Sequence, residues 1–265
     1  MRSEPLEVAV VGAGPAGLAA GIHLARAGIC HRVFERHRPG GLLHAAGLVE
    51  CYPGFPRGIQ GPRLAAAMVR QARALGARIE AVEVTAARWE GRFLLEAGGS
   101  WAATCLILAT GTRPRGAAPP GYSGSVHFGT DTLPRRLVGR RVWVSGGGDA
   151  AFDSALQARR RGADVGVFLR GEPKAMALLV TRAAAAGVLV HRGRSLAEAL
   201  AAGAPDHLLI CHGRDPENGL LAGLAAEVPG LFLAGDLTRC GLRYAAVAAG
   251  DGLAAARLAE ACLGR

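Results

Sequence analysis

The chain lacks any cysteine pattern that is typical of a metal site or a disulfide framework. Its six cysteines contain no C-x-x-C pair and no metal-ligand spacing. In a chain of this size we therefore expect reduced thiols and no bound metal. The cysteines are Cys30, Cys51, Cys105, Cys211, Cys240 and Cys262.

Long hydrophobic runs are also absent. No stretch approaches the ~18 unbroken apolar residues of a membrane span, so we expect no membrane partner. The first β-rich run begins within a few residues of Met1, so we expect no signal peptide and a cytoplasmic protein. The length of 265 residues is compatible with one or two domains.

Lysine and aromatic residues are scarce. Lys174 is the only lysine, although the formal net charge is +10, and aromatic residues make up 5% of the chain. The arginines are scattered, without a long basic run or interleaved aromatics, so we do not expect nucleic acid as a partner. A net positive surface still favours anionic cofactors or an acidic redox protein.

What the chain does contain is a glycine-rich turn that occurs twice. A β-rich run leads into residues 12–17 (GAGPAG), another leads into residues 146–151 (GGGDAA), and an Ala-rich helical stretch follows each turn. In such a turn the first glycine allows a tight bend, the second lets the backbone approach a pyrophosphate, and the third position packs the helix against the strand. The pattern predicts two bound dinucleotides. The expected contacts are Gly12, Gly14, Pro15, Ala16 and Gly17 in the first turn, and Gly146, Gly148, Asp149 and Ala151 in the second.

Glu35 lies at the end of the second expected strand, 31–35, and 21 residues after Gly14. An acidic side chain at this spacing hydrogen-bonds the ribose of a bound adenosine. The alternative is a solvated glutamate at the end of a strand.

Strands and helices alternate along the chain, which predicts an α/β fold of two Rossmann-like domains with doubly wound parallel sheets. The Pro- and Gly-rich stretch 113–124 is interpreted as an interdomain linker. We expect a discontinuous first domain, 1–114 and 216–265, and an inserted, shortened second domain, 118–214. Helices are expected over 18–27, 63–75, 150–161, 174–186 and about 244–262. Strands are expected over 8–11, 31–35, 105–109, 141–145, 164–169, 188–191 and 208–211, with further β-rich segments near 78–86 and 92–95.

Three further motifs give the chain a family resemblance. They are residues 52–62 (YPGFPRGIQGP), 107–111 (ILATG) and 230–236 (GLFLAGD). With the first glycine turn and Glu35, they resemble the two-dinucleotide-binding flavoprotein reductases, and most closely the low-molecular-weight thioredoxin reductases. The resemblance implies FAD at the first turn, NADP or NAD at the second, and a homodimer. It implies that Asp236 binds the ribityl chain and that the helix starting near Ala245 points its N-terminus at the flavin. The remaining FAD contacts that it implies are Gly41, Val84, Thr110, Gly111 and Gly235.

The chain departs from this group at its redox centre. Thioredoxin reductases carry C-A-T-C-D shortly before the second glycine turn, and this chain has GTDTL at 129–133. Without that pair a flavin cannot pass electrons through an internal disulfide. Residues 126–128 (VHF) and 146–153 are instead similar to the thioredoxin-reductase-like ferredoxin–NAD(P) reductases. We therefore expect an FAD-dependent NAD(P)H oxidoreductase, not a classical dithiol enzyme, with ferredoxin, flavodoxin or a small molecule as acceptor. A flavin oxidase or dehydrogenase that needs no NAD(P)H, and a non-catalytic flavin-binding redox sensor, are the alternatives.

Some side chains are candidates for specificity or for contact with the flavin. Arg170 follows the strand 164–169, where with Lys174 it would bind the 2′-phosphate of NADP; an NAD site or a degenerate site are alternatives. Cys51, Tyr52 and His44, as well as His127, are candidates to lie near the flavin. A small buried cysteine, a core tyrosine and structural histidines are the competing interpretations. Hydride transfer needs positioning and not a dedicated acid or base, so no catalytic residue is assigned with certainty.

Overall fold

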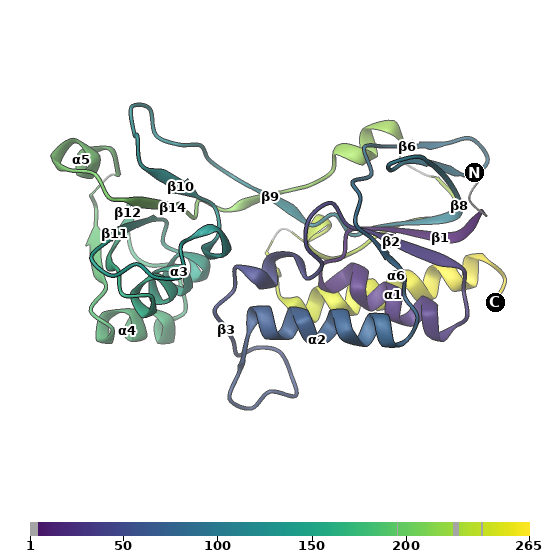
Figure 1. Ribbon diagram of the computed structural model, residues 1–265, viewed down its shortest axis with the longest axis horizontal. Coiled ribbons are helices and arrows are strands. Elements are labelled where there is room, and N and C mark those ends of the chain that lie inside the picture. The colour runs from purple at the N-terminus through teal and green to yellow at the C-terminus, as the bar shows by residue number, and fades with distance from the viewer. Residues whose placement is uncertain (1–4, 195, 225–227, 240) are drawn as a thin grey trace. The chain divides into compact units, whose positions relative to one another are not determined.

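The computed structural model describes residues 5–194, 196–224, 228–239 and 241–265. The chain divides into two compact units (Figure 1). Unit 1 comprises Met1–Leu43, Glu50–Arg113 and Pro216–Arg265, and unit 2 comprises His44–Val49 and Pro114–Asp215. The strands β9 (Thr112–Pro114) and β15 (Arg214–Pro216) pair where the chain passes between the units. The first two residues of the expected linker 113–124 belong to β9, and the chain passes from unit 1 to unit 2 at Arg113 and Pro114.

Unit 1 is built on a seven-stranded sheet in the order β5-β2-β1-β8-β7-β6, with β16 also paired to β8. The pairs among β5, β2, β1, β8 and β16 are parallel, whereas β6 and β7 form an antiparallel extension. The strand expected at 105–109 begins earlier, because residues 100–103 pair with β7. The strands are β1 (Leu6–Val11), β2 (His31–Phe34), β5 (Ile79–Glu80), β6 (Ala86–Trp89), β7 (Phe93–Glu96), β8 (Ser100–Leu108) and β16 (Leu231–Leu233).

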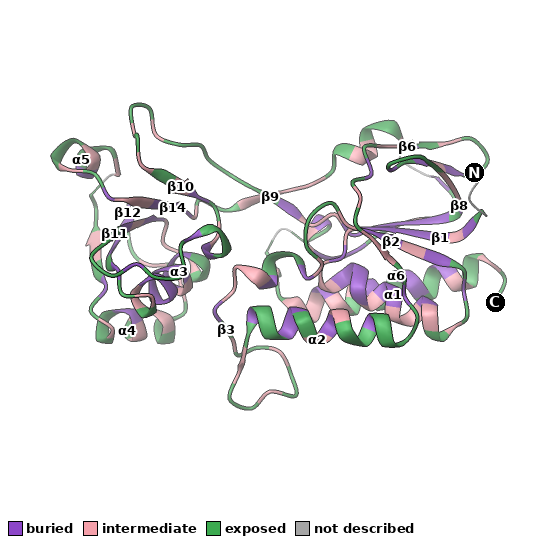
Figure 2. Ribbon diagram, in the orientation of Figure 1, coloured by how far each residue is buried: buried purple, intermediate pink, exposed green. Residues whose placement is uncertain are grey.

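Three long helices cover one face of this sheet (Figure 1): α1 (Pro15–Arg26), α2 (Gly61–Ala74) and α6 (Ala245–Cys262). Helices α1 and α6 pack in close contact, since a Cβ on Gly252 would lie 1.9 Å from the carbonyl oxygen of Ala16. The other face buries Phe34, Phe93 and Leu106 in one apolar cluster. Central strands buried on both faces explain the continuous apolar runs in the sequence (Figure 2).

Unit 2 contains a parallel five-stranded sheet in the order β10-β14-β11-β12-β13. Its core packs Phe152 of α3 against the buried valines of β11 and β12. The expected helix 174–186 starts later, at Ala177, because the N–H groups of Lys174 and Ala175 donate to the carbonyl of Gly147. The elements are β10 (Ser125–His127), β11 (Arg141–Ser145), α3 (Asp149–Arg160), β12 (Asp164–Leu169), α4 (Ala177–Ala185), β13 (Leu189–Arg192), α5 (Leu196–Ala202) and β14 (His207–Ile210). The α/β class with parallel sheets in both halves is confirmed.

Short elements complete the fold. They are β3 (Leu48–Val49), β4 (Ile59–Gln60) and the 3-10 turns η1 (Gly41–His44), η2 (Thr130–Thr132), η3 (Gly219–Gly223) and η4 (Gly235–Leu237). Among the described residues, no helix has the length and apolar character to cross a membrane. The five described cysteines are free thiols, and Cys240 lies outside the described residues.

Candidate functional site

The first glycine turn joins β1 to α1 at the carboxyl end of the parallel strands of unit 1. Gly12 has a φ of +101°, and a Cβ there would lie 2.3 Å from the carbonyl oxygen of Ala109. A Cβ on Gly17 would lie 1.7 Å from the carbonyl oxygen of Gly12. Gly14 differs, because no atom lies within 4 Å of the position its Cβ would take. Packing explains Gly12 and Gly17, while Gly14 faces open space that a ligand can approach.

The start of α1 is free of side-chain caps. Gly14 is the N-cap in an extended conformation, Pro15 occupies the first turn, and no side chain hydrogen-bonds this end. The first N–H groups of a helix have no intrahelical acceptor and carry the positive end of its dipole. This end of α1 can therefore bind an anion such as a pyrophosphate.

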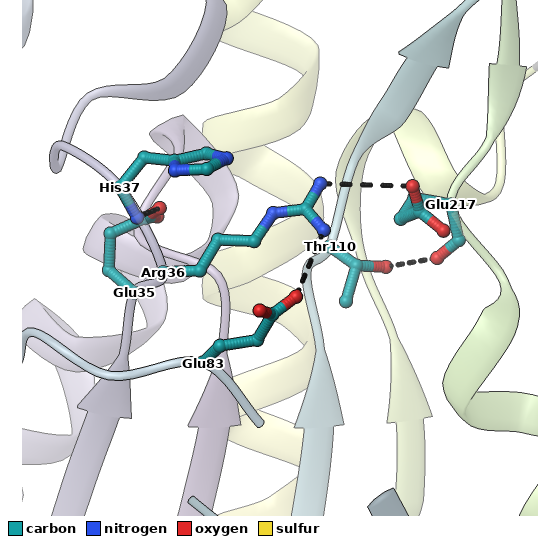
Figure 3. A network of polar contacts seen from close by, with 6 residues as sticks. All are labelled: Glu35, Arg36, His37, Glu83, Thr110 and Glu217. Atoms are coloured by element: carbon teal, nitrogen blue, oxygen red, sulfur yellow. Dashed lines mark hydrogen bonds and ion pairs between the residues drawn. The ribbon is translucent and has the colours of Figure 1, made fainter. Parts of the chain in front are cut away.

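Glu35 is held beside this turn. Its Oε2 accepts the N–H of Ala13 at 2.8 Å. Its Oε1 accepts the N–H of His37 at 2.9 Å (Figure 3). The side chain is half-buried, so it is not the freely solvated glutamate of the alternative interpretation. A carboxylate has about four acceptor positions, which leaves capacity for ribose hydroxyls.

Arg36 joins three segments of unit 1 in a polar network (Figure 3). Its guanidinium lies 3.4 Å from Oε1 of Glu83 and 3.7 Å from Oε2 of Glu217. The hydroxyl of Thr110 donates to the carbonyl of Glu217 at 2.6 Å, and the N–H of Glu217 donates to the carbonyl of Gly111. The hydroxyl proton of Thr110 is therefore donated to a hydrogen bond within the chain. The sequence interpretation missed Arg36, Glu83 and Glu217; only the position of Arg36 after Glu35 gave any signal.

Two other predicted glycines contact the same turn. A Cβ on Gly41 would lie 3.2 Å from Cα of Gly14, and one on Gly235 would lie 2.9 Å from Cβ of Ala16. Asp236 follows Gly235 in η4 and is half-buried. Ala245 is the first residue of α6, whose N-terminus has no side-chain cap. The structure therefore gathers predicted residues from β1, β2, β8 and β16 at one end of the sheet.

Three candidates of unit 1 lie outside these contacts. Val84 is 7% exposed and packs in the apolar core, so it can meet a ligand only through its main chain. Cys51 is exposed, so the interpretation as a small buried cysteine is wrong. Tyr52 is half-exposed and its ring centroid lies 6.1 Å from that of Phe55, so it is not a core aromatic.

The second glycine turn repeats the construction of the first. Gly146 has a φ of +144°, and a Cβ there would lie 2.4 Å from the carbonyl oxygen of Cys211 at the end of the neighbouring strand β14. Gly148 again has nothing within 4 Å of its Cβ position and caps α3 without a side-chain bond. Ala151 holds the position in the second turn that Gly17 holds in the first, and it is fully buried. Each unit thus carries one open turn at an uncapped helix.

Several side chains surround the second turn. Asp149 accepts the N–H of Met176 at 2.8 Å. Arg170 is exposed after β12, as is Lys174. His212 pairs its Nε2 with the hydroxyl of Ser145 at 2.7 Å, and partial desolvation, then the charge of Arg170, lowers its pKa below the usual value. The sequence interpretation missed Ser145 and His212, since neither belongs to a recognisable spacing.

Residues 129–133 form a turn in unit 2 that contains η2, called the closed turn below because its side chains contact the unit itself. Thr130 is fully buried, and its hydroxyl lies 2.7 Å from the carbonyl of Ala45. Gln157 donates to the same carbonyl at 2.8 Å, and Asp153 accepts the N–H of Gly47 at 2.7 Å. The segment His44–Val49, with the candidate His44, thus belongs to unit 2. Leu133 is buried in the core of this unit.

His127 also lies in unit 2, where it is 8% exposed. Its Nδ1 lies 2.8 Å from the hydroxyl of Thr132, and its Nε2 lies 3.1 Å from Nδ1 of His207. Both ring nitrogens are therefore engaged within the unit. Among the described residues, no group of three or more His, Cys, Asp or Glu side chains is arranged to hold a metal ion.

Comparison with known proteins places these features in context. The model of the family described as pyridine nucleotide-disulphide oxidoreductase matches residues 6–252. The chain is 32% identical over 298 residues to a bifunctional thioredoxin reductase/thioredoxin of Mycobacterium leprae, covering 96% of this chain and 65% of that protein. It is 27% identical over 308 residues to the thioredoxin reductase of Chlamydia trachomatis, covering 96% and 97%.

Solved structures share the fold. The thioredoxin reductase of Lactococcus lactis in its FR conformation superposes with a TM-score of 0.87 at 24% identity, covering 98% of this chain and 99% of that one.

The chain spans less than two thirds of the length of the first curated relatives that it matches, including 60% of a thioredoxin reductase of Mycolicibacterium smegmatis.

Proposed function

The chain belongs to the pyridine nucleotide-disulphide oxidoreductase family, and we propose that it transfers electrons from NADPH through FAD to an acceptor without an internal dithiol. Its relatives are thioredoxin reductases, a group that uses FAD and NADPH. The observation that carries the proposal is the repeated construction of the two turns, in which Gly12 and Gly146 meet the end of a neighbouring strand while Gly14 and Gly148 face open space.

FAD is assigned to unit 1. The uncapped start of α1 would bind its pyrophosphate through main-chain N–H groups, and Glu35 would accept hydrogen bonds from its ribose. Asp236 and the N-terminus of α6 would lie along the remaining part of FAD. There the dipole of α6 would favour negative charge on the reduced flavin. When bound, FAD supplies the hydride-accepting chemistry, and these residues bind and orient it.

NADPH is assigned to unit 2. The N-terminus of α3 at Gly148 would bind its pyrophosphate, as α1 does in unit 1. Arg170 and Lys174 are exposed cations near this turn, and β12 ends without an acidic residue. A guanidinium suits a 2′-phosphate, whereas an acidic residue would favour the free hydroxyls of NAD.

The closed turn at 129–133 argues against the dithiol route of the related enzymes. Gly129 and Thr132 stand where the resemblance expects cysteines, and Leu133 stands where it expects an acid. Thr130 buries its hydroxyl against Ala45, which holds the turn on unit 2. An acceptor that takes electrons from the flavin itself, such as ferredoxin, flavodoxin or a small molecule, fits this arrangement. Acidic carrier proteins would be attracted to a chain of net charge +10.

The test is a turnover assay under anaerobic conditions with the FAD-loaded protein. NADPH is the donor, and ferredoxin, flavodoxin, thioredoxin and an artificial dye are the acceptors in separate reactions. We expect turnover with the dye and with at least one acceptor other than thioredoxin. Turnover with thioredoxin alone would refute the proposal that the chain works without a dithiol.

Two outcomes would replace the proposal with another function. Oxygen consumption with a small organic substrate, and none with NADPH, would identify a flavin oxidase. No turnover with any acceptor, despite bound FAD, would identify a non-catalytic flavin-binding protein.

A further inference from the structure

We propose that Cys105 and Cys262 form a reversible redox pair, which closes into a disulfide between β8 and α6 of unit 1. Cys105 lies within β8 and is fully buried, whereas Cys262 is the last residue of α6 and is exposed. The Cys262 side chain is close enough to Cys105 to influence the pKa of its thiol. The Sγ of Cys105 also lies 3.9 Å from the carbonyl of Ala259, one helical turn before Cys262.

The packing of α6 against β8 brings the two cysteines into the same part of unit 1. Helix α6 lies against β8, with Ala259 fully buried at the contact. Residues three apart on a helix share a face, so Cys262 lies on the side of α6 that carries Ala259. Cys262 is the last residue of the helix, so the closure that we propose needs a shift of the terminal turn alone.

The two thiols differ in reactivity. Burial, followed by the interaction with the Cys262 side chain, raises the pKa of Cys105 to about 12. Cys105 is buried and is therefore shielded from reagents in water. Cys262 is open to solvent, so an oxidant meets Cys262 first.

The oxidant that we assign is a hydroperoxide, represented by hydrogen peroxide. The sulfur of Cys262 attacks one peroxide oxygen, which gives a sulfenic acid on Cys262 and one water. The sulfur of Cys105 then attacks that of Cys262, the S–OH bond breaks, and the proton of Cys105 leaves with the hydroxide as a second water. Two thiols lose two electrons in total, and the peroxide gains them. A small dithiol reductant reverses the step.

The measurement is peptide mapping of the wild-type protein after treatment with hydrogen peroxide. Remaining thiols are blocked under denaturing conditions, and the digest is analysed by mass spectrometry without reduction. We expect one linked peptide pair that contains Cys105 and Cys262, lighter by about 2 Da than the two separate peptides, and lost after reduction. Cys30→Ser is the matched control, because Cys30 is also exposed in unit 1, and it should form the same link.

Variants of the pair separate the two steps. In Cys105→Ser, the sulfenic acid on Cys262 should persist, so that dimedone labels it several-fold more than in the wild type. In Cys262→Ser, Cys105 should resist the same peroxide treatment. Equal dimedone labelling of Cys262 in the wild type and in Cys105→Ser would overturn the proposal, as would a link from Cys262 to another cysteine or to a second chain. The wild-type map decides the question even if a variant fails to fold.

Discussion

The N–H of Ala13 donates to the carboxylate of Glu35 at 2.8 Å, which links the first glycine turn directly to the end of β2. Ala13 and Glu35 lie 22 positions apart in the sequence, yet this hydrogen bond joins them at one edge of unit 1. The same carboxylate fixes His37 through its other oxygen. Glu35 is thus oriented by two hydrogen bonds within the chain.

Replacing this glutamate should weaken FAD binding. In Glu35→Ala we expect roughly a 10- to 100-fold increase in the Kd for FAD, because a hydrogen bond to a charged group contributes about 1.5–3 kcal/mol. Glu35→Gln should have a smaller effect, since the amide oxygen can still accept one bond. Titration of the apoprotein with FAD, followed by fluorescence, measures both. Glu90→Gln, at an exposed glutamate, is the control, and equal affinity in all variants would refute the assignment.

Alanine substitutions at two glycines of the first turn should affect FAD binding and protein stability separately. Gly14 has a φ of −71° and nothing near its Cβ position, so Gly14→Ala should fold normally but lose at least about 10-fold in FAD affinity. Gly17→Ala places a methyl group 1.7 Å from a carbonyl oxygen, and should lower the free energy of unfolding by about 3 kcal/mol or more. Denaturant unfolding of the apoprotein and FAD titration distinguish the two. A Gly14→Ala protein that binds FAD as tightly as the wild type would contradict the assigned pyrophosphate position.

Arg170 should set the preference for NADPH. Loss of its guanidinium in Arg170→Ala should raise the KM for NADPH by about 10-fold and leave the KM for NADH nearly unchanged, because only NADPH carries the 2′-phosphate. Steady-state reduction of an artificial dye measures both constants. Arg192→Ala, at an exposed arginine paired with Glu172, is the control. An equal rise in the KM for NADPH and for NADH would mean that Arg170 does not bind the 2′-phosphate.

His127 should make the stability of the protein depend on pH. Burial, then the neighbouring His207, lowers the pKa of His127 below the usual value of 6.5. The unfolded chain then binds more protons than the folded one below this value, so the contribution of His127 to stability is lost as the pH falls through about 6.5. His127→Gln should flatten the fall in Tm between about pH 7 and pH 5. His37→Gln, at an exposed histidine, should retain the wild-type slope, and an unchanged slope in His127→Gln would contradict the prediction.

The sequence predicted the parts of the fold that depend on local patterns. The two glycine turns lie between a strand and a helix as expected, because the positive φ of Gly12 and Gly146 leaves a local sequence signature. Contacts between distant segments were not predictable. Arg36 meets Glu217 across the sheet, and Thr130 meets Ala45 from another part of the chain. The antiparallel β6 and β7 were expected only as β-rich segments, because pairing direction depends on the assembled sheet.

The central claim is that NADPH reduces a flavin bound to this chain, and anaerobic rapid mixing tests it most directly. The FAD-loaded protein is mixed with NADPH or with NADH, and the flavin absorbance is followed in time, with Gly148→Ala as the matched variant. We predict that NADPH bleaches the flavin faster than NADH does, and that Gly148→Ala slows the bleaching at low NADPH concentration. A flavin that neither nucleotide reduces at the rate of turnover would contradict the account.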